Sequence, residues 1–491
     1  MKKLSIILVV MLFMVSACED FLVKNPHDQV ATEQAIQTMD DAMVALNGVY
    51  DGFKSASYYG RNFVAYSDVQ ADVVQSVIGY SNQLGEIYKW SFLSDNGGIT
   101  NAWDLMYTVI VRASNVIDAL PNIEGDEAEL NQIEGEARLA RAIAHFDLVK
   151  AFAKAYTQSN PSVDLGVPII EHFEIAEPER NSIEEVYSFI LSEAATAASL
   201  MTDGGADDVS SVFLTKTAAE AFMARVNLYM GQWSDAVSHA TNVIDNPNYS
   251  LASDSAEYAD MFLNDQGSEV IFRVGLTKAD YDGRYIGYNY YNSSQGLPNS
   301  DYIPAQWIID AFGANDIRRD IVFRHSDTKF GWDWDLVWKY PGNPLFYDNP
   351  DVTTNSNMYK MFRLSEMYLI RAEANAELDN DAIAVQDYNT LRSNRIEGYV
   401  NESLTGNALK TAIWDERQRE LCFEGHRLWD LKRKGLGFTR VPVVHPTDGT
   451  ITNPGPSQSQ LSVTSDNDRW LWPIPDEELK ANANITPNPG Y

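Results

Sequence analysis

The chain has 491 residues, of which 45% are hydrophobic and 11% aromatic, and a formal net charge of −32. This length and apolar fraction support a sizeable core and exclude a disordered chain. The negative charge argues against nucleic acid and anionic lipid as partners, and suits neutral or cationic ligands better. The aromatic content fits a packed helical core, a surface that stacks on flat ligand faces, or both.

The N-terminus has the order of a secretory signal peptide. Lys2 and Lys3 precede an almost unbroken apolar run over residues 4–15. The run is shorter than the roughly 20 residues of a membrane span, and no comparable run follows it. We therefore expect residues 1–17 to be removed on export.

Small residues immediately before Cys18 resemble a bacterial lipobox, in which this cysteine is acylated and becomes the first mature residue. Ordinary cleavage after Ala17 is the alternative, but it would leave an exported free thiol that is open to oxidation. Once Cys18 carries lipid, Cys422 has no cysteine to pair with, so a disulfide framework is excluded. The fold must rest on its core.

The first periodic segments along the chain are helical. Thr32 or Asp28 is placed to cap a first helix, and a second runs from about Asn101 to Leu120, where Pro121 ends it. The expected core-facing stripe of the first helix consists of Ala35, Met39, Met43, Leu46 and Tyr50. A third helix over 136–156 has alanines at positions that allow a close helical neighbour.

Two segments resemble tetratricopeptide helical hairpins. In residues 217–247 one helix is expected to end at Gly231, Ser234 to cap the next, and Pro247 to lie just past its end. Residues 363–395 repeat the pattern, but the two are too far apart for a simple tandem array. The sequence therefore predicts a mainly α, tetratricopeptide-like scaffold with little β structure.

Residues 250–357 interrupt this scaffold with a stretch rich in Gly, Asn, Asp, Pro and aromatics that has no sustained helical period. We predict a large irregular insertion, of the kind that commonly carries function. The expected organisation is one unit over 18–491, with helical scaffold over about 30–250 and 358–435 and a loop-rich tail over about 436–491.

The C-terminal third carries a long charged motif. Residues 416–433 read ERQRELCFEGHRLWDLKR, and this run resembles the signature of the SusD/RagB family of outer-membrane nutrient-binding lipoproteins. Pieces similar to the family's follow its order over nearly the whole chain: CEDFLVKNP from Cys18, Trp103-x3-Tyr107 with Asn115, EAxxxRAxxHF from Glu136, RLSExYLxRAEA from Arg363, WPIP from Trp472 and the terminal NPGY. Glu19 and Asp20 also resemble the export signal of Bacteroidetes surface lipoproteins.

The resemblance implies a helical scaffold with a variable loop region, on the outer face of the outer membrane. It also implies a partner, a TonB-dependent SusC-like transporter over which the protein sits as a lid. The expected role is capture of a glycan without chemistry, and no cofactor is expected. A peptide or other nutrient is the alternative cargo, since the RagB branch resembles a peptide-uptake component, and a surface glycosidase is a further alternative.

The charged motif itself could suggest catalysis or a metal. Glu420, Glu424, His426 and Asp430 are close in sequence, and two carboxylates are what a glycosidase needs. The alternation of Glu with Arg at ion-pairing spacing favours a structural network instead. The spacing Glu424-x-His426-x3-Asp430 matches no common set of metal ligands. Whether a metal binds elsewhere is left open.

Sugar binding needs aromatic rings for stacking, flanked by polar groups for hydroxyls. Two groups in the insertion meet this need. In the first, the candidate contacts are Arg284, Tyr288, Asn289 and Tyr290, and in the second Trp332, Asp333, Trp334 and Asp335, with Trp338 close by. Alternation places Trp332 and Trp334 on one side of an extended segment, opposite the aspartates. A further group at Asp68, Asp72, Tyr80 and Trp90 could border the same site.

Overall fold

The fold, taken from a computed structural model, is mainly α-helical, as the sequence predicts. The structure describes residues 35–204, 210–280, 286–291, 293–294, 297–346, 356–455 and 461–491. Its helices are α2 (Met39–Phe53), α3 (Asn62–Gln70), α4 (Gly85–Tyr88), α5 (Gly97–Ala119), α6 (Glu127–Phe152), α7 (Ile183–Leu200), α8 (Lys216–Met230), α9 (Trp233–Ile244), α10 (Ser255–Leu263), α11 (Gln306–Asp310), α12 (Arg319–Val322), α13 (Leu364–Glu377), α14 (Asp381–Ser393), α15 (Gly406–Glu420), α16 (Arg427–Arg433) and α17 (Asp476–Ala481).

The strands are short. They are β1 (Val74–Val77), β2 (Val270–Arg273), β3 (Ser293–Ser294), β4 (Leu297–Pro298), β5 (Tyr302–Pro304), β6 (Phe323–Asp327), β7 (Asp333–Val337), β8 (Lys360–Arg363), β9 (Phe438–Thr439), β10 (Val444–His445), β11 (Gly449–Thr450), β12 (Thr452–Asn453) and β13 (Ser462–Val463). Among the described residues, the largest sheet has the order β12-β1-β5, and the others are two-stranded. Apart from the extended segment at residues 332–335, the sequence did not indicate these strands, because most are too short to show alternation.

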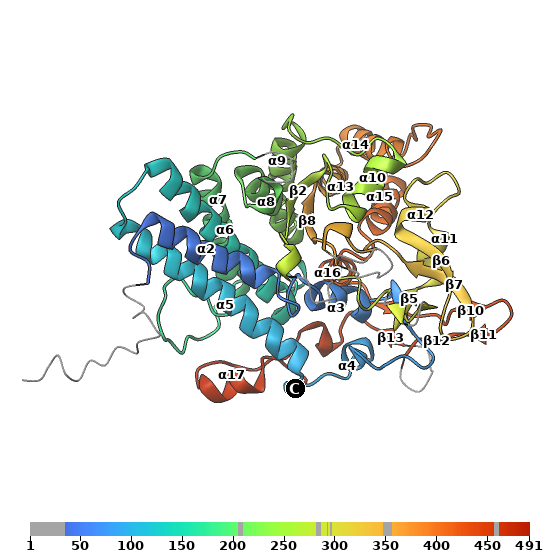
Figure 1. The fold of residues 1–491 in the computed structure, drawn as a ribbon, viewed down its shortest axis with the longest axis horizontal. Helices are drawn as coiled ribbons and strands as arrows, with labels where there is room; N and C mark the ends of the chain where they lie inside the picture. The colour runs from blue at the N-terminus through green and yellow to red at the C-terminus, as the bar shows by residue number, and fades with distance from the viewer. Residues whose placement is uncertain are drawn as a thin grey trace, which may run out of the picture.

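The long helices pack against their neighbours in chain order, from α5 through α6, α7 and α8 to α9. Helix α9 then contacts α13, which packs on α14 and α15. The two predicted hairpins, α8–α9 and α13–α14, therefore lie side by side although the insertion separates them in sequence. Figure 1 shows the long helices at one end of the molecule and the strands β5, β6, β7, β10 and β11 at the other.

The start of the first described helix differs from the sequence prediction. Helix α2 begins at Met39, where the Thr38 hydroxyl accepts from the backbone of Asp41 in a capping box. The positions proposed as caps, Thr32 and Asp28, lie outside the described residues. The expected stripe is also wrong in part, because Met43 is 51% exposed while the buried face is that of Ala42, Leu46, Val49 and Phe53. Both stripes have helical spacing, and only the packing of α2 on α5 and α6 selects one.

The α8–α9 hairpin follows its predicted boundaries closely. Gly231 ends α8 in the left-handed conformation at φ +71°, as a C-terminal glycine does. Helix α9 begins directly afterwards at Trp233, so Ser234 lies inside its first turn and is not the cap. The chain needs only Gly231 and Gln232 to reverse direction.

A single large apolar cluster joins the N-terminal helices to the end of the chain. It includes residues from α2 as well as Trp472 and Ile485 in the C-terminal tail. A smaller cluster lies under the β6–β7 hairpin at the strand-rich end. Over the part of the chain that the structure describes, every helix is too short or too polar to cross a membrane.

Candidate functional site

The β6–β7 hairpin presents two kinds of side chain on its two faces. The strands are antiparallel, with His325 opposite Asp335. Successive side chains of a strand point to opposite faces. Trp332 and Trp334 pack on the smaller apolar cluster, whereas Asp333 and Asp335 both contact His325. The structure therefore separates the rings from the carboxylates in the way that the Trp-Asp alternation predicts.

The apolar side of the hairpin supports a group of half-buried rings that we call the aromatic patch. Its members are Tyr80, Phe330, Trp334 and Trp338. Phe330 lies parallel to the buried Trp332, with ring centroids 5.6 Å apart. Trp338 meets the buried Tyr291 edge-on at 4.5 Å. Because these contacts fix the rings while leaving part of each exposed, the patch can stack on a flat apolar ligand face.

The opposite face of the hairpin carries an ion-paired polar cluster. The Nδ1 atom of His325 lies 2.9 Å from Asp335 and its Nε2 atom 2.8 Å from Asp333. Hydrogen bonds to Asp333 and then to Asp335 raise the pKa of His325. Arg319 also reaches Asp335 at 3.1 Å, and His445 lies 3.3 Å from Asp333. These carboxylates thus have cationic partners within the protein and can still accept hydrogen bonds from hydroxyls at their exposed edges.

The structure places several other candidates in the interior. Tyr290, Asn289, Asp68 and Trp90 are 1 to 6% exposed, and Asp72 is 8% exposed. The Tyr290 hydroxyl donates to Asp68 at 3.0 Å, and the Trp90 indole donates to the Gln70 carbonyl at 2.7 Å. Arg427 holds Asp72 through two hydrogen bonds of 2.7 and 2.8 Å. Because these side chains are buried, most of them with partners inside the protein, we assign them to the scaffold and not to the candidate ligand surface.

Tyr288 is not brought to the aromatic patch. Tyr288 is half-buried beneath the guanidinium of Arg61, 5.4 Å from the ring centroid, and its ring is not part of the cluster under the hairpin. Arg284 and Cys18 lie outside the described residues. Within the described ranges, no group of three or more His, Cys, Asp or Glu side chains is arranged to hold a metal ion.

Asp68 is unusual among the buried carboxyls in this region. Burial raises its pKa from 3.8 to about 7, against the hydrogen bonds from Tyr290 and the Gly425 backbone, which lower it. Two charged side chains that contact each other near Asp68 also act on this pKa. Lys339 lowers it, and Glu424 of the charged motif raises it. The folded protein therefore keeps a proton that the unfolded chain releases above about pH 4.

We expect Asp68→Asn to become more stable relative to the wild type as pH rises from 4 to 7. A raised carboxyl pKa means that stability falls with rising pH over this window, by roughly 1.4 kcal/mol per unit. The neutral amide avoids this loss. The difference in free energy of unfolding between Asp68→Asn and the wild type should therefore grow by up to about 4 kcal/mol and then level off above pH 7. Urea unfolding at several pH values measures it. A difference that does not vary with pH would show that Asp68 ionises normally.

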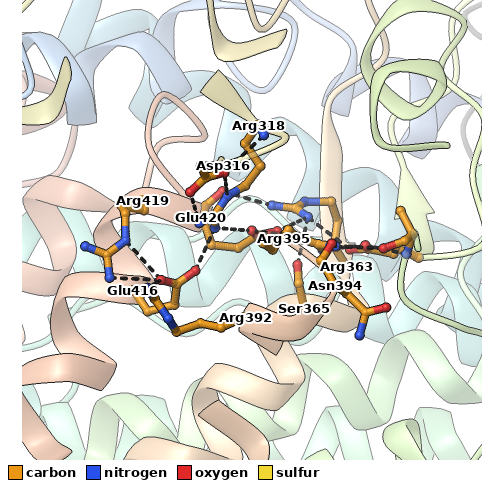
Figure 2. Close-up of polar contacts among 12 residues, drawn as sticks. Asp316, Arg318, Arg363, Ser365, Arg392, Asn394, Arg395, Glu416, Arg419 and Glu420 are labelled. Carbon is orange, nitrogen blue, oxygen red and sulfur yellow. Dashed lines mark hydrogen bonds and ion pairs between the residues drawn. The ribbon is translucent and has the colours of Figure 1, made fainter. Parts of the chain in front are cut away.

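The charged motif forms a buried ion-pair network rather than an accessible carboxylate pair. Figure 2 shows Glu416 and Glu420 enclosed by arginines from distant parts of the chain. Arg318 donates to Glu416 at 2.7 Å and to Glu420 at 2.8 Å. Arg363 and Arg395 reach Glu420 at 2.9 and 3.0 Å. The structural interpretation of the motif is confirmed.

The other charged groups of the motif are occupied in the same way. Glu424 pairs with Lys339 and with Arg363, and Asp430 pairs with Arg417 and Arg433. All of these side chains are buried. A polysaccharide cannot reach these carboxylates, so this motif does not supply the two accessible groups that glycoside hydrolysis requires.

Several features of the aromatic patch were missed by the sequence reasoning. Phe330 continues the alternation of Trp332 and Trp334, so extending that pattern by one step would have found it. His325 faces Asp335 only through the strand register. His445 comes from β10, far along the chain, and no sequence signal links it to Asp333.

Two family models match separate parts of this chain. Residues 20–228 match the family model described as "Starch-binding associating with outer membrane". Residues 338–491 match the SusD family model. Together with the relatives described next, these matches show that the chain belongs to the SusD/RagB family.

Relatives align over the whole chain. SusD-like protein P2 of Formosa agariphila is 26% identical, with all of both chains covered. A SusD superfamily structure from Bacteroides thetaiotaomicron superposes with a TM-score of 0.81 at 27% identity, covering 92% of this chain and 100% of the other. A candidate sugar-binding protein from Bacteroides vulgatus gives a TM-score of 0.80 at 27% identity, covering 93% and 99%.

Proposed function

We propose that the protein captures a glycan at the aromatic patch and passes it to a TonB-dependent transporter of the outer membrane. The observation that carries the proposal is the set of four fixed, half-buried rings at the strand-rich end. Family membership supports it, and so does the description of one structural neighbour as a candidate sugar-binding protein.

The patch provides the two kinds of contact that a sugar needs. Phe330, Trp334 and Trp338 supply ring surfaces for the apolar face of a pyranose, while Trp332 supports Phe330 from beneath. Asp333, Asp335 and His325 lie on the opposite face of the same hairpin, so they offer acceptors and a donor only to the hydroxyl groups of a ligand that extends around its edge. Exposed aromatics gathered at one end of an acidic protein are poorly explained by solubility and are typical of a binding surface.

We expect Phe330→Ala and Trp338→Ala each to weaken glycan binding by roughly thirty-fold, since one well-placed aromatic contributes about 2 kcal/mol. Calorimetric titration with a panel of oligosaccharides measures binding, and a melting curve for each variant separates binding from folding. Trp233→Ala, at a half-buried tryptophan of α9 in the helical scaffold, is the matched control and should bind as the wild type does.

Three results would count against this proposal. Normal affinity in the Phe330→Ala/Trp338→Ala double variant would remove the patch as the site. Retention of peptides without retention of any sugar would favour the alternative cargo. Sustained release of reducing ends from an oligosaccharide by the purified protein would favour a glycosidase.

The membrane anchor and the transporter partner form the second half of the proposal. The signal segment, Cys18 and the acidic pair Glu19-Asp20 support a lipid-anchored protein on the cell exterior. The lid-like position over a transporter rests on the resemblance to the family. No docking surface is assigned.

In native membranes we expect the wild type to be recovered in the outer-membrane fraction together with a large barrel protein. Cys18→Ala removes the acylated thiol, so this variant should leave that fraction or remain unprocessed. Cys422→Ala removes the other, buried cysteine and should fractionate as the wild type does. Normal fractionation of Cys18→Ala would contradict the anchor, and repeated recovery without a barrel protein would contradict the partner.

A further inference from the structure

Three basic side chains surround the aromatic patch without a carboxylate partner. The Lys89 ammonium lies 5.8 Å from the ring centroid of Tyr80, and that of Lys329 lies 5.1 Å from Phe330. The Arg324 guanidinium lies 4.5 Å from Trp338. Within the part of the chain that the structure describes, none of the three is in an ion pair, and Lys89 has only the side-chain oxygen of Asn82 at 3.1 Å. Three of the four rings of the patch thus carry a cation whose charge is not neutralised by a carboxylate.

This arrangement differs from that of the arginines around Glu420. The sequence has 69 acidic and 37 basic residues, so a basic side chain has many carboxylates available as partners. Arg318, Arg363 and Arg395 each contact two or more carboxylates. Three cations without a carboxylate partner among the described residues, gathered around one surface of an acidic protein, therefore suggest a role in binding an anion.

The carboxylates nearest in sequence do not cancel these charges. In the β6–β7 register, Asp327 lies opposite Asp333 and His325 opposite Asp335, so these four side chains share one face. Arg324 lies opposite Leu336, on the other face with the rings. Asp333 and Asp335 are also held by His325 and Arg319.

One further carboxylate borders the patch. Asp301 accepts hydrogen bonds from the backbone and the hydroxyl of Ser81 and makes no ion pair among the described residues. The side of the hairpin with the rings therefore gathers three cations, with one buried carboxylate at its border, although the molecule as a whole is strongly negative.

We propose that the aromatic patch selects a glycan that carries negative charges, either uronate carboxylates or sulfate esters. Lys89, Arg324 and Lys329 bind the anionic groups while the rings beneath them stack on the sugar. A cation already positioned over a ring keeps part of that attraction when it turns to the ligand's anion. The inference rests on the proposed function, because it concerns the same patch.

The net charge of −32 does not prevent this selection. At physiological ionic strength charges are screened over about 8 Å, whereas the three cations would touch the ligand directly. Arg324 lies within β6 and Lys329 in the turn that follows it, so the two cations meet different parts of a ligand that lies along the hairpin. A charged chain of several sugar units fits this arrangement better than a single sugar.

The test compares three probes against three proteins by calorimetric titration. The probes are an oligogalacturonate, a sulfated galactan oligosaccharide and a neutral glucan oligosaccharide. The proteins are the wild type, the triple variant Lys89→Gln/Arg324→Gln/Lys329→Gln and a control, Arg112→Gln/Lys216→Gln/Lys480→Gln. The control changes the net charge equally but at exposed positions far along the sequence from the patch. Melting curves confirm that each variant folds.

We expect an acidic probe to bind the wild type more tightly than the neutral glucan does. The triple variant should bind that probe at least tenfold more weakly, since each charge-assisted contact is worth about a tenfold change, and the control should bind normally. Added salt should weaken binding to the wild type more than to the triple variant. Tighter binding of the oligogalacturonate identifies carboxylates as the preferred anions, and tighter binding of the galactan identifies sulfates.

Other outcomes overturn the inference in distinguishable ways. Equal or tighter binding of the neutral glucan, sensitive to Phe330→Ala but not to the triple variant, would overturn charge selection and leave the proposed function standing. An equal loss in the control would show that only net charge matters, which also overturns it. Failure of all three probes to bind the wild type would overturn the inference and count against glycan capture at the patch.

Discussion

Replacing Glu420 with glutamine is expected to lower the free energy of unfolding by about 3 to 5 kcal/mol, the cost of breaking a buried ion pair by removing one partner. Its carboxylate is fully buried and accepts hydrogen bonds from Arg318, Arg363 and Arg395 (Figure 2). Glutamine keeps the shape but not the charge, so three buried guanidinium groups lose a shared counter-charge. These groups come from β8 and from the segments before α12 and after α14, so the loss affects the joint between scaffold and insertion.

Urea unfolding at pH 7 measures the effect of Glu420→Gln. The matched control is Glu377→Gln, which removes a charge from a pair with Lys410 at 2.7 Å on a surface where the Glu377 side chain is 28% exposed. A solvent-exposed pair of this kind is worth under about 1 kcal/mol. Equal losses of unfolding free energy in the two variants would show that the buried network stabilises the fold no more than an exposed ion pair does.

The same variant has a predictable pH dependence. The arginines around Glu420, with Arg395 and Arg363 foremost, hold its pKa well below the ordinary value of 4.5 despite burial. Arg318, Arg419 and Arg392 act on Glu416 in the same direction and lower its pKa to about 2. A depressed carboxyl pKa contributes stability above the unfolded value, which is lost as pH falls towards the folded value. The difference in free energy of unfolding between wild type and Glu420→Gln should therefore reach its full size above about pH 5 and shrink below pH 4.

The sequence predicted only part of this network. The spacing of Glu416 and Arg419 places them on one helical face, and they do pair at 2.9 Å. Arg318 and Arg395 belong to segments that nothing in the motif indicates. Arg318 meets Glu420 because the insertion folds back onto α15, and Arg395 meets it because α14 packs on α15. Local spacing predicts contacts within one helix, whereas contacts between distant segments depend on the completed tertiary structure.

The candidate site shows the same division. The alternation in residues 332–335 correctly separated rings from carboxylates, because a strand has a fixed period of two. Tyr290 and Trp90 were expected at the surface and are buried. In an irregular segment no period distinguishes an aromatic that packs inward from one that faces solvent. The net charge of the chain was also a poor guide to the charge around the patch. It favoured neutral or cationic ligands, whereas the three cations at the patch, which have no carboxylate partner among the described residues, suit an anionic one.

Trp429→Ala is expected to lower the free energy of unfolding by about 3 to 5 kcal/mol without changing the ligand affinity of the folded protein. Trp429 is 2% exposed, stacks on Phe63 at 5.9 Å and contacts Trp472 at 5.8 Å. Truncation would leave a cavity where α16, α3 and the C-terminal tail meet. The indole lies in the main core cluster and not in the cluster under the aromatic patch.

The informative comparison pairs Trp429→Ala with Trp338→Ala. The first should melt at lower temperature and bind glycan normally below its melting point, and the second should melt normally and bind weakly, because Trp338 is half-buried at the patch. Trp429→Phe, which keeps a ring in the core, should fall between wild type and Trp429→Ala in stability and provides a folded variant if the alanine chain does not fold. If a Trp429 variant has normal stability but no longer binds the glycan, the charged motif is part of the ligand site and not only of the scaffold. Thermal melting and calorimetric titration of the same preparations decide between these outcomes.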